Sequence, residues 1–135
     1  GDTGSAESDL RFVLAAQPDN ASALNALGYL LANNNANLDE AYRLINKALA
    51  LRPEDPAIMD SMGWILYRQG HNEEAILRLQ KAFDLEPNDE IAAHLGEVLW
   101  ANGQQRDAES IWKQGLKIKP DSELIHTTRK RLQSS

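Results

Sequence analysis

Residues 56–87 read PAIMDSMGWILYRQGHNEEAILRLQKAFDLEP. Apolar residues recur in this stretch three and four positions apart, which is the spacing of one helix face. They are Ile58, Met59, Met62, Ile65 and Leu66 in the first half, and Ala75, Ile76, Leu79, Ala82 and Phe83 in the second. A polar turn at Gly70-His71-Asn72 separates the halves, and Pro87 stops the second one. The stretch therefore predicts two antiparallel helices, over residues 58–69 and 73–85.

The same marks return along the chain at a regular interval. The prolines Pro18, Pro53, Pro87 and Pro120 are separated by 35, 34 and 33 residues. Between them, a glycine and then an alanine recur in the same order, at Gly28, Gly63 and Gly96 and at Ala41, Ala75 and Ala108. This pattern resembles the tetratricopeptide repeat family, whose unit is a helix pair of about 34 residues. The resemblance covers almost the whole chain. It implies an all-α fold, a right-handed α-α superhelix of about seven to eight antiparallel helices.

The period divides the chain into five segments. We expect three full repeats at 21–54, 55–88 and 89–121, because each contains one copy of the marks. Ala6 lies 12 residues before Pro18, so 1–20 is expected to hold the second helix of a truncated preceding repeat. The stretch 122–135 is expected to form a capping helix, since a solenoid covers its last apolar face. A helix at 6–16 would expose Leu10, Val13 or Leu14 and self-associate; the alternative is a small protein with a one-helix cap.

Composition excludes several classes of protein. The chain has 135 residues, of which 42% are hydrophobic and 25% are charged, as in globular proteins. Its net charge of −6 would repel phosphate backbones, so nucleic acid is not an expected partner. No apolar run approaches the roughly 18 residues of a membrane span, so direct membrane insertion by this chain is not expected.

The sequence offers no catalytic or cofactor-binding pattern. There is no cysteine, and His71, His94 and His126 lack the spacing of a zinc site such as H-E-x-x-H. No phosphate-binding glycine loop and no G-x-S-x-G motif occur. Acidic pairs such as Glu73-Glu74 suit the first turn of a helix, where negative charge is favourable. We therefore expect no enzyme activity, no metal and no cofactor.

The resemblance implies a binding groove instead. In this family the first helix of each repeat lines a concave face that binds partner proteins or peptides. Positions around each repeat glycine line that face, and His94 lies beside them. The predicted groove residues are Asn25, Tyr29, Asn33, Asp60, Trp64, Tyr67, Arg68, His94, Glu97 and Trp100. The alternative is that Trp64 and Trp100 pack between adjacent first helices. Trp112, like Ile45 and Leu79, is expected in the core.

One subclass of the family is excluded by charge. Members that hold the C-terminal carboxylate of heat-shock chaperones use lysine, arginine and asparagine on their first helices. Here Arg68 is the one cation among the predicted groove residues, and a carboxylate needs charged donors to offset its desolvation.

Two stretches resemble a narrower group. Residues 60–70, DSMGWILYRQG, and 90–100, EIAAHLGEVLW, are similar to the C-terminal repeats of proteobacterial outer-membrane tetratricopeptide lipoproteins. The best-characterised type is a scaffold or adaptor that binds a carboxyl-terminal processing protease and gathers its cell-wall hydrolase substrates. The resemblance implies a bacterial periplasmic location, with the full-length protein anchored to the outer membrane, and partners of these kinds.

Two functions remain open at this point. The first is a non-catalytic adaptor whose groove binds a partner segment, with Trp64, Tyr67 and Trp100 as anchors and Asp60 and Glu97 selecting basic or amide groups. The second is a structural end of a longer repeat array, which packs within its own protein or forms a homo-oligomer through the exposed N-terminal helix.

Overall fold

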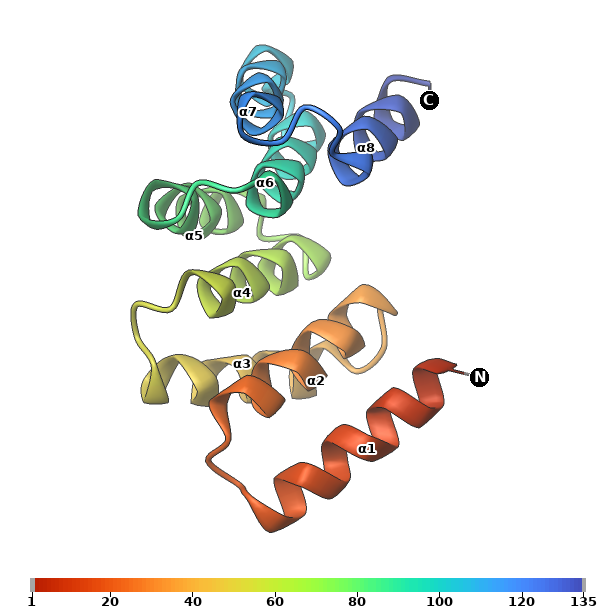
Figure 1. Cartoon of the computed structure of the whole chain (residues 1–135), viewed down its shortest axis with the longest axis vertical. Coiled ribbons are helices and arrows are strands. Elements are labelled where there is room, and N and C mark those ends of the chain that lie inside the picture. The colour runs from red at the N-terminus through yellow and green to blue at the C-terminus, as the bar shows by residue number, and fades with distance from the viewer. Residues whose placement is uncertain (1, 135) are drawn as a thin grey trace.

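The computed structural model describes residues 2–134, and within them the chain forms eight α-helices and no strand. The helices are α1 (Asp2–Ala16), α2 (Ala21–Asn33), α3 (Leu38–Leu51), α4 (Pro56–Arg68), α5 (Asn72–Leu85), α6 (Asp89–Ala101), α7 (Gln105–Ile118) and α8 (Glu123–Gln133). They stack in chain order from α1 to α8 (Figure 1). The prediction of an all-α solenoid with seven to eight helices is confirmed.

The helices pair as α2 with α3, α4 with α5, and α6 with α7. These pairs fall within the three predicted repeats, whose boundaries stay a prediction. Gly1 and Ser135, at the ends of the predicted segments 1–20 and 122–135, lie outside the described residues. Successive first helices α2, α4, α6 and α8 contact one another. We call the side of the stack that they form the first-helix face.

A side-chain cap starts each of these first helices. Each cap accepts a hydrogen bond from a backbone N–H two or three residues later in the chain. The caps are Asn20, Asp55, Asn88 and Ser122. Such a cap stabilises a helix by about 1 kcal/mol, because it satisfies an N–H that has no partner inside the helix. Each cap follows one of the repeated prolines by one or two residues, so the sequence sets the helix starts at the same interval as the repeat.

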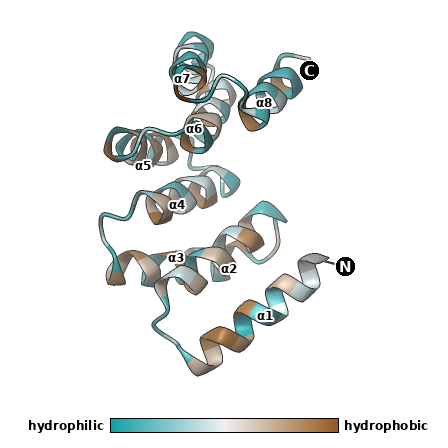
Figure 2. Ribbon diagram, viewed as in Figure 1, coloured by the Kyte–Doolittle hydropathy of each residue, from teal (hydrophilic) through white to brown (hydrophobic). Residues whose placement is uncertain are grey.

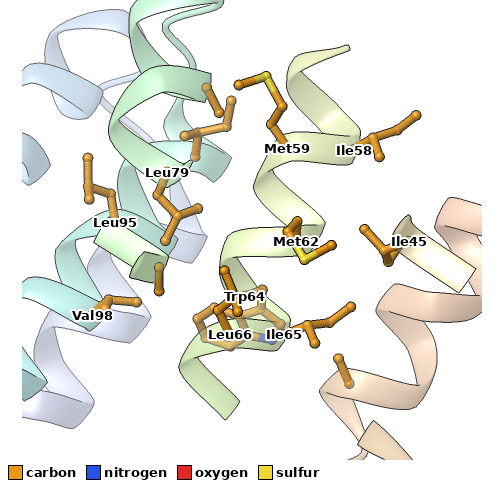
Figure 3. Packing of buried hydrophobic residues seen from close by; sticks show 14 of the residues in the cluster. Ile45, Ile58, Met59, Met62, Trp64, Ile65, Leu66, Leu79, Leu95 and Val98 are labelled. Carbon is orange, nitrogen blue, oxygen red and sulfur yellow. The ribbon is translucent and has the colours of Figure 1, made fainter. Parts of the chain in front are cut away.

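Within each pair, a glycine of the first helix faces a large side chain of the second. A Cβ atom added at Gly28 or Gly63 would lie 2.6 Å from Ile45 or Leu79, and one at Gly96 would lie 1.9 Å from Nε1 of Trp112. The three large side chains are fully buried, which confirms the prediction of core positions. Figure 3 shows the core on both sides of α4, with Ile45 facing it from one side and Leu79 and Leu95 from the other.

The first and last helices pack differently from the rest. Arg11 of α1 forms two hydrogen bonds to Glu40 of α3, at 2.9 and 3.0 Å. Leu10 and Leu14 of α1 pack on the core rather than lying exposed, whereas Phe12 is 78% exposed. The hydrophobic residues of α1 gather toward its C-terminal end (Figure 2). The expectation that Leu10, Val13 or Leu14 would be exposed is wrong, because all three are partly buried and Phe12 is the largely exposed apolar side chain of α1.

The last helix, α8, lies against α6 and touches α7 little (Figure 1). Its N-cap Ser122 donates to Asp89 of α6 at 2.7 Å. Two contacts join α8 to Glu109 of α7: Arg129 forms an ion pair with it, and the side-chain amide of Gln133 donates a hydrogen bond to it. Among residues 2–134, no helix combines the length and the apolar character that crossing a bilayer requires.

Candidate protein-binding face

The ten predicted groove residues all lie on first helices, but they differ in how far a partner can reach them. Asn33 and Arg68 are exposed, and Asn25, Tyr29, Tyr67 and Trp100 are partly buried. Asp60, Trp64, His94 and Glu97 are buried. The structure joins most of these side chains into networks that run between neighbouring repeats.

One network links α2, α4 and α6. The Nδ1 atom of His94 lies 2.8 Å from Oδ1 of Asp60 and 3.1 Å from Oδ2, so one ring nitrogen serves both carboxylate oxygens. The Nε2 atom of the same ring lies 3.2 Å from the Tyr29 hydroxyl. Asp60 and His94 are each 5% exposed. Buried charges are tolerated when they are paired and hydrogen-bonded, and this pair meets that condition.

The charges around His94 change its protonation. Burial by itself lowers the pKa of His94, but the neighbouring carboxylates of Asp60, Glu90 and Glu97 outweigh burial and raise the pKa above its ordinary value. Burial also raises the pKa of Tyr29 to about 12, and Asp60 contributes to that rise. The network therefore favours an imidazolium–carboxylate pair beside a neutral phenol.

Trp64 lies at the centre of the face, beneath other side chains. Its ring centroid is 4.5 Å from that of His94 and 5.2 Å from that of Tyr67, and the Arg68 guanidinium lies 5.1 Å from its centroid. The side chain is 4% exposed, and its Nε1 has no hydrogen-bond partner among residues 2–134. Trp64 thus packs between first helices, which is the alternative considered for it above, while Tyr67 and Arg68 cover it.

A second network links α4, α6 and α8. The Tyr67 hydroxyl donates to Oε2 of Glu97 at 3.1 Å, and Arg131 of α8 donates to Oε1 of Glu97 at 2.5 Å. Burial raises the pKa of Tyr67 to about 12, with a further contribution from Glu97. Glu97 is thereby held by partners from both neighbouring first helices.

Trp100 does not join these networks. Its ring stacks on that of Trp112, with centroids 5.8 Å apart, and it lines an open recess with Arg106 and Lys113 of α7. Within the described residues Trp112 is the aromatic ring that it contacts. The structure therefore separates Trp100 from Trp64 and Tyr67, although the repeat pattern had placed all three on one face.

Asn33 also lies apart, at the C-terminal end of α2 and exposed. Asn25 lines a recess of about 180 Å³ between α2, α4 and the start of α6. Tyr29, Asp60 and Glu90 contribute to the same recess. The Oδ1 atom of Asn25 is buried and has no hydrogen-bond partner within residues 2–134.

Sequence reasoning missed Arg131 and Glu90 as members of this face. A signal for Arg131 is present in the sequence: Asp60 and His94 are 34 residues apart, and so are Glu97 and Arg131. Opposite charges one repeat apart lie on adjacent first helices, so the repeat period predicts these pairs. Glu90 carries no such signal, because the residues that line a recess depend on the directions of their side chains.

The described residues hold no group of three or more histidine, aspartate or glutamate side chains that could bind a metal ion. His126 is exposed, and its Nε2 lies 3.1 Å from the backbone oxygen of Pro120.

Comparison with known sequences gives one consistent family. Residues 1–56 and residues 66–132 each match a family model described as Tetratricopeptide repeat. The TPR repeat-containing protein PA4667 of Pseudomonas aeruginosa is 56% identical over 96 residues, which are 71% of this chain and 16% of the relative. The human Tetratricopeptide repeat protein 7A is 34% identical over 96 residues, 70% of this chain and 11% of that protein. The chain thus spans less than a quarter of these relatives.

Solved structures agree on the fold. TTC0263, a thermophilic TPR protein of Thermus thermophilus, superposes with a TM-score of 0.82 at 20% identity, covering 99% of this chain and 73% of that one. MamA from Desulfovibrio magneticus RS-1 gives a TM-score of 0.74 at 21% identity, covering 91% of this chain and 70% of that one. At this level of identity the likeness supports the fold alone.

Proposed function

Because the chain belongs to the tetratricopeptide repeat family, we propose that it is a non-catalytic protein-interaction module whose first-helix face binds a segment of a partner protein. The observation that carries the proposal is the pair of polar networks centred on His94 and Glu97. Stacking a solenoid requires apolar contacts, and burying charges adds a desolvation cost. These networks hold the side chains of the surface in one geometry. A surface that is already ordered loses less conformational entropy when it binds a partner.

Three side chains that belong to the networks or lie over Trp64 are open to a partner. Tyr29 and Tyr67 are partly buried with their hydroxyls fixed, and Arg68 lies exposed over Trp64. Aromatic residues with a polar tip and arginine are the types enriched among residues that dominate binding energy. Trp64 supports them from below, so its role in the proposal is to position Tyr67 and Arg68.

For the location and partner we propose the bacterial cell envelope and a processing protease or its cell-wall hydrolase substrates. The resemblance of residues 60–70 and 90–100 to envelope lipoproteins supports this location and these partners, and the 56% identity to a Pseudomonas aeruginosa relative supports a bacterial setting. The test is affinity capture from a bacterial envelope extract with this chain as bait, read by mass spectrometry.

The decisive variant is Tyr67→Ala with Arg68→Ala. The chain offers a matched control, Tyr42→Ala with Arg43→Ala, because that pair is exposed on the second helix α3, away from the networks. A protease or hydrolase captured by the wild type and the control, with affinity reduced about 30-fold or more in the decisive variant, supports the proposal. Equal capture by all three proteins places binding elsewhere and refutes it.

Self-association is the second candidate function, and the exposure of Phe12 favours it. Phe12 is 78% exposed, and an apolar recess of about 370 Å³ between α1, α2 and α3 lies on the same end of the stack, lined by Leu14, Leu24, Leu27 and Leu44. If this end joins two copies, sedimentation velocity shows a dimer that Phe12→Asp removes. Leu77→Asp is the matched control, because Leu77 is 73% exposed on α5. A monomer at all concentrations rejects this candidate.

A further inference from the structure

The recess between α2, α4 and the start of α6 has the size of a side-chain pocket. Its volume is about 180 Å³, below the roughly 300–1,000 Å³ of pockets that enclose whole small molecules. At about 30 Å³ per water, it holds the equivalent of roughly six waters. It therefore suits the end of one long side chain that reaches in from the first-helix face.

The polar groups in its wall are mostly acceptors with negative charge. Carboxylates of Asp60, Glu86 and Glu90 line it, and no lysine or arginine of the described chain does. Asp60 is buried, and among residues 2–134 its two oxygens share a single donor, Nδ1 of His94, although a carboxylate offers about four acceptor positions. Because the raised pKa of His94 favours its imidazolium form, that ring balances part of the charge of Asp60, and the negative charge open to a ligand comes mainly from the exposed Glu86 and Glu90.

A second, independent acceptor is Oδ1 of Asn25. Asn25 lines the recess, and its Oδ1 is buried and has no hydrogen-bond partner among residues 2–134. Buried polar atoms without partners are rare because they are costly. A ligand that donates a hydrogen bond to Oδ1 of Asn25 would satisfy this atom.

The chemistry of the wall selects among ligands. Anions are repelled by the carboxylates. A metal ion lacks ligands, since no group of three suitable side chains converges within the described residues. An ammonium or guanidinium group supplies several donors and a positive charge, and its aliphatic stem packs along apolar walls such as Ala57 and Ile91.

We propose that this recess binds the cationic end of a lysine or arginine side chain presented by a partner segment. The inference rests on the proposed function, since it names the chemistry of the segment that the first-helix face accepts. The charge of the proposed ligand is opposite to that of the C-terminal carboxylate held by the chaperone-binding members of the family. The tyrosine ring of Tyr29 forms one wall, so a partner bound there lies next to the Tyr29–His94–Asp60 network.

The experiment uses two small probes rather than an unidentified partner. N-acetyl-lysine methylamide and its uncharged analogue N-acetyl-norleucine methylamide are titrated into the 15N-labelled chain, and amide shifts are followed by NMR. We expect saturable shifts for the lysine probe, centred on residues 25, 60, 61 and 90, and none centred there for the norleucine probe. Binding should weaken with rising salt, because the recess is partly open to solvent.

Variants locate the binding to the recess. Asn25→Leu removes the unpartnered acceptor and should reduce affinity about tenfold, as expected for losing a hydrogen bond to a charged group. Glu90→Gln, on the exposed rim, should reduce it about two- to fivefold. Glu73→Gln is the matched control, since Glu73 is an exposed glutamate in the first turn of α5, outside the recess. It should leave affinity unchanged.

The outcomes are distinct from those of the capture experiment. If both probes shift the same residues, or if Glu73→Gln weakens binding as much as Glu90→Gln, the cation site is refuted whether or not a partner is captured. If Asn25→Leu does not fold, Glu90→Gln alone decides. If the lysine probe binds as expected and no partner is captured, the cation site stands and the proposed function fails.

Discussion

The Asp60–His94 pair allows a prediction with a sign and a magnitude. Two unit charges 2.8 Å apart attract by about 6 kcal/mol at an effective dielectric constant of about 20. Desolvation of each buried ion opposes this by several kcal/mol, so the intact pair contributes little net stability. Replacing Asp60 by Asn removes the attraction and leaves the desolvation of His94. We expect Asp60→Asn to lower the free energy of unfolding by about 3–5 kcal/mol when His94 is protonated.

The loss should depend on pH in one direction. In the wild type the pKa of folded His94 is raised, so its contribution is fully present below the unfolded value of about 6.5 and is lost as the pH rises through the folded value. In the variant burial becomes the dominant influence, with Glu90 and Glu97 as the remaining carboxylates and Tyr29 the remaining hydrogen-bond partner. The variant should therefore lose most stability, about 3–5 kcal/mol, near pH 5.5, and progressively less as the pH rises through the raised pKa of folded His94.

The assay is urea unfolding followed by far-UV circular dichroism at several pH values between about 5.5 and 8, with the His94 ring titrated by NMR. Asp89→Asn is the control, because Asp89 accepts a hydrogen bond from the Ser122 hydroxyl at 2.7 Å rather than from a histidine. Its effect should not grow as the pH falls. A loss for Asp60→Asn that is constant across this range, or larger at pH 8, refutes the argument that the pair is ionised and buried.

Three further predictions concern the elements that frame the site. Gly96→Ala should lower the free energy of unfolding by roughly 2 kcal/mol, because overpacking against the Trp112 ring outweighs the better helix propensity of alanine. Urea unfolding measures this loss, and in a Trp112→Leu background Gly96→Ala should cause little loss. Ser122→Ala should cost about 1–2 kcal/mol and increase hydrogen exchange in α8, whereas unchanged exchange contradicts its role as the cap. Raising the pH from about 10 to 12 should destabilise the chain, because the pKa of folded Tyr67 is raised to about 12; Tyr67→Phe should flatten this part of the alkaline unfolding curve.

The fold follows from the sequence because its determinants are local and repeated. Each proline, with the polar cap that follows it, determines where a helix starts, and each glycine allows two helices to pack closely. These marks recur three or four times, so the helix boundaries predicted from one copy can be checked against the other copies. The registration of Ile45, Leu79 and Trp112 in the core follows from the same spacing.

The site was less predictable, because the position of a residue on a helix face does not determine its exposure. The pattern identifies Trp64 and Trp100 as neighbours on one face, but Trp64 is covered by Tyr67 and Arg68, and Trp100 turns toward Trp112. Which way a ring turns depends on the volumes around it, and those arise from three helices at once. The helix α8 adds Arg131 to the face because it lies on α6, and the distance of one period from Glu97 is the sequence signal for that contact.

The pairs that lie one period apart give the repeats an order. Apolar stacking alone would let similar helix pairs exchange places or be duplicated, since every interface would look alike. Asp60 pairs with His94 of the next repeat, and Glu97 pairs with Arg131 of the segment that follows its own repeat. A shuffled or lengthened array would leave a carboxylate buried opposite the wrong neighbour. The units of this chain are therefore not interchangeable modules, and an engineered array built from copies of one of them would have to supply both halves of each pair within the copy.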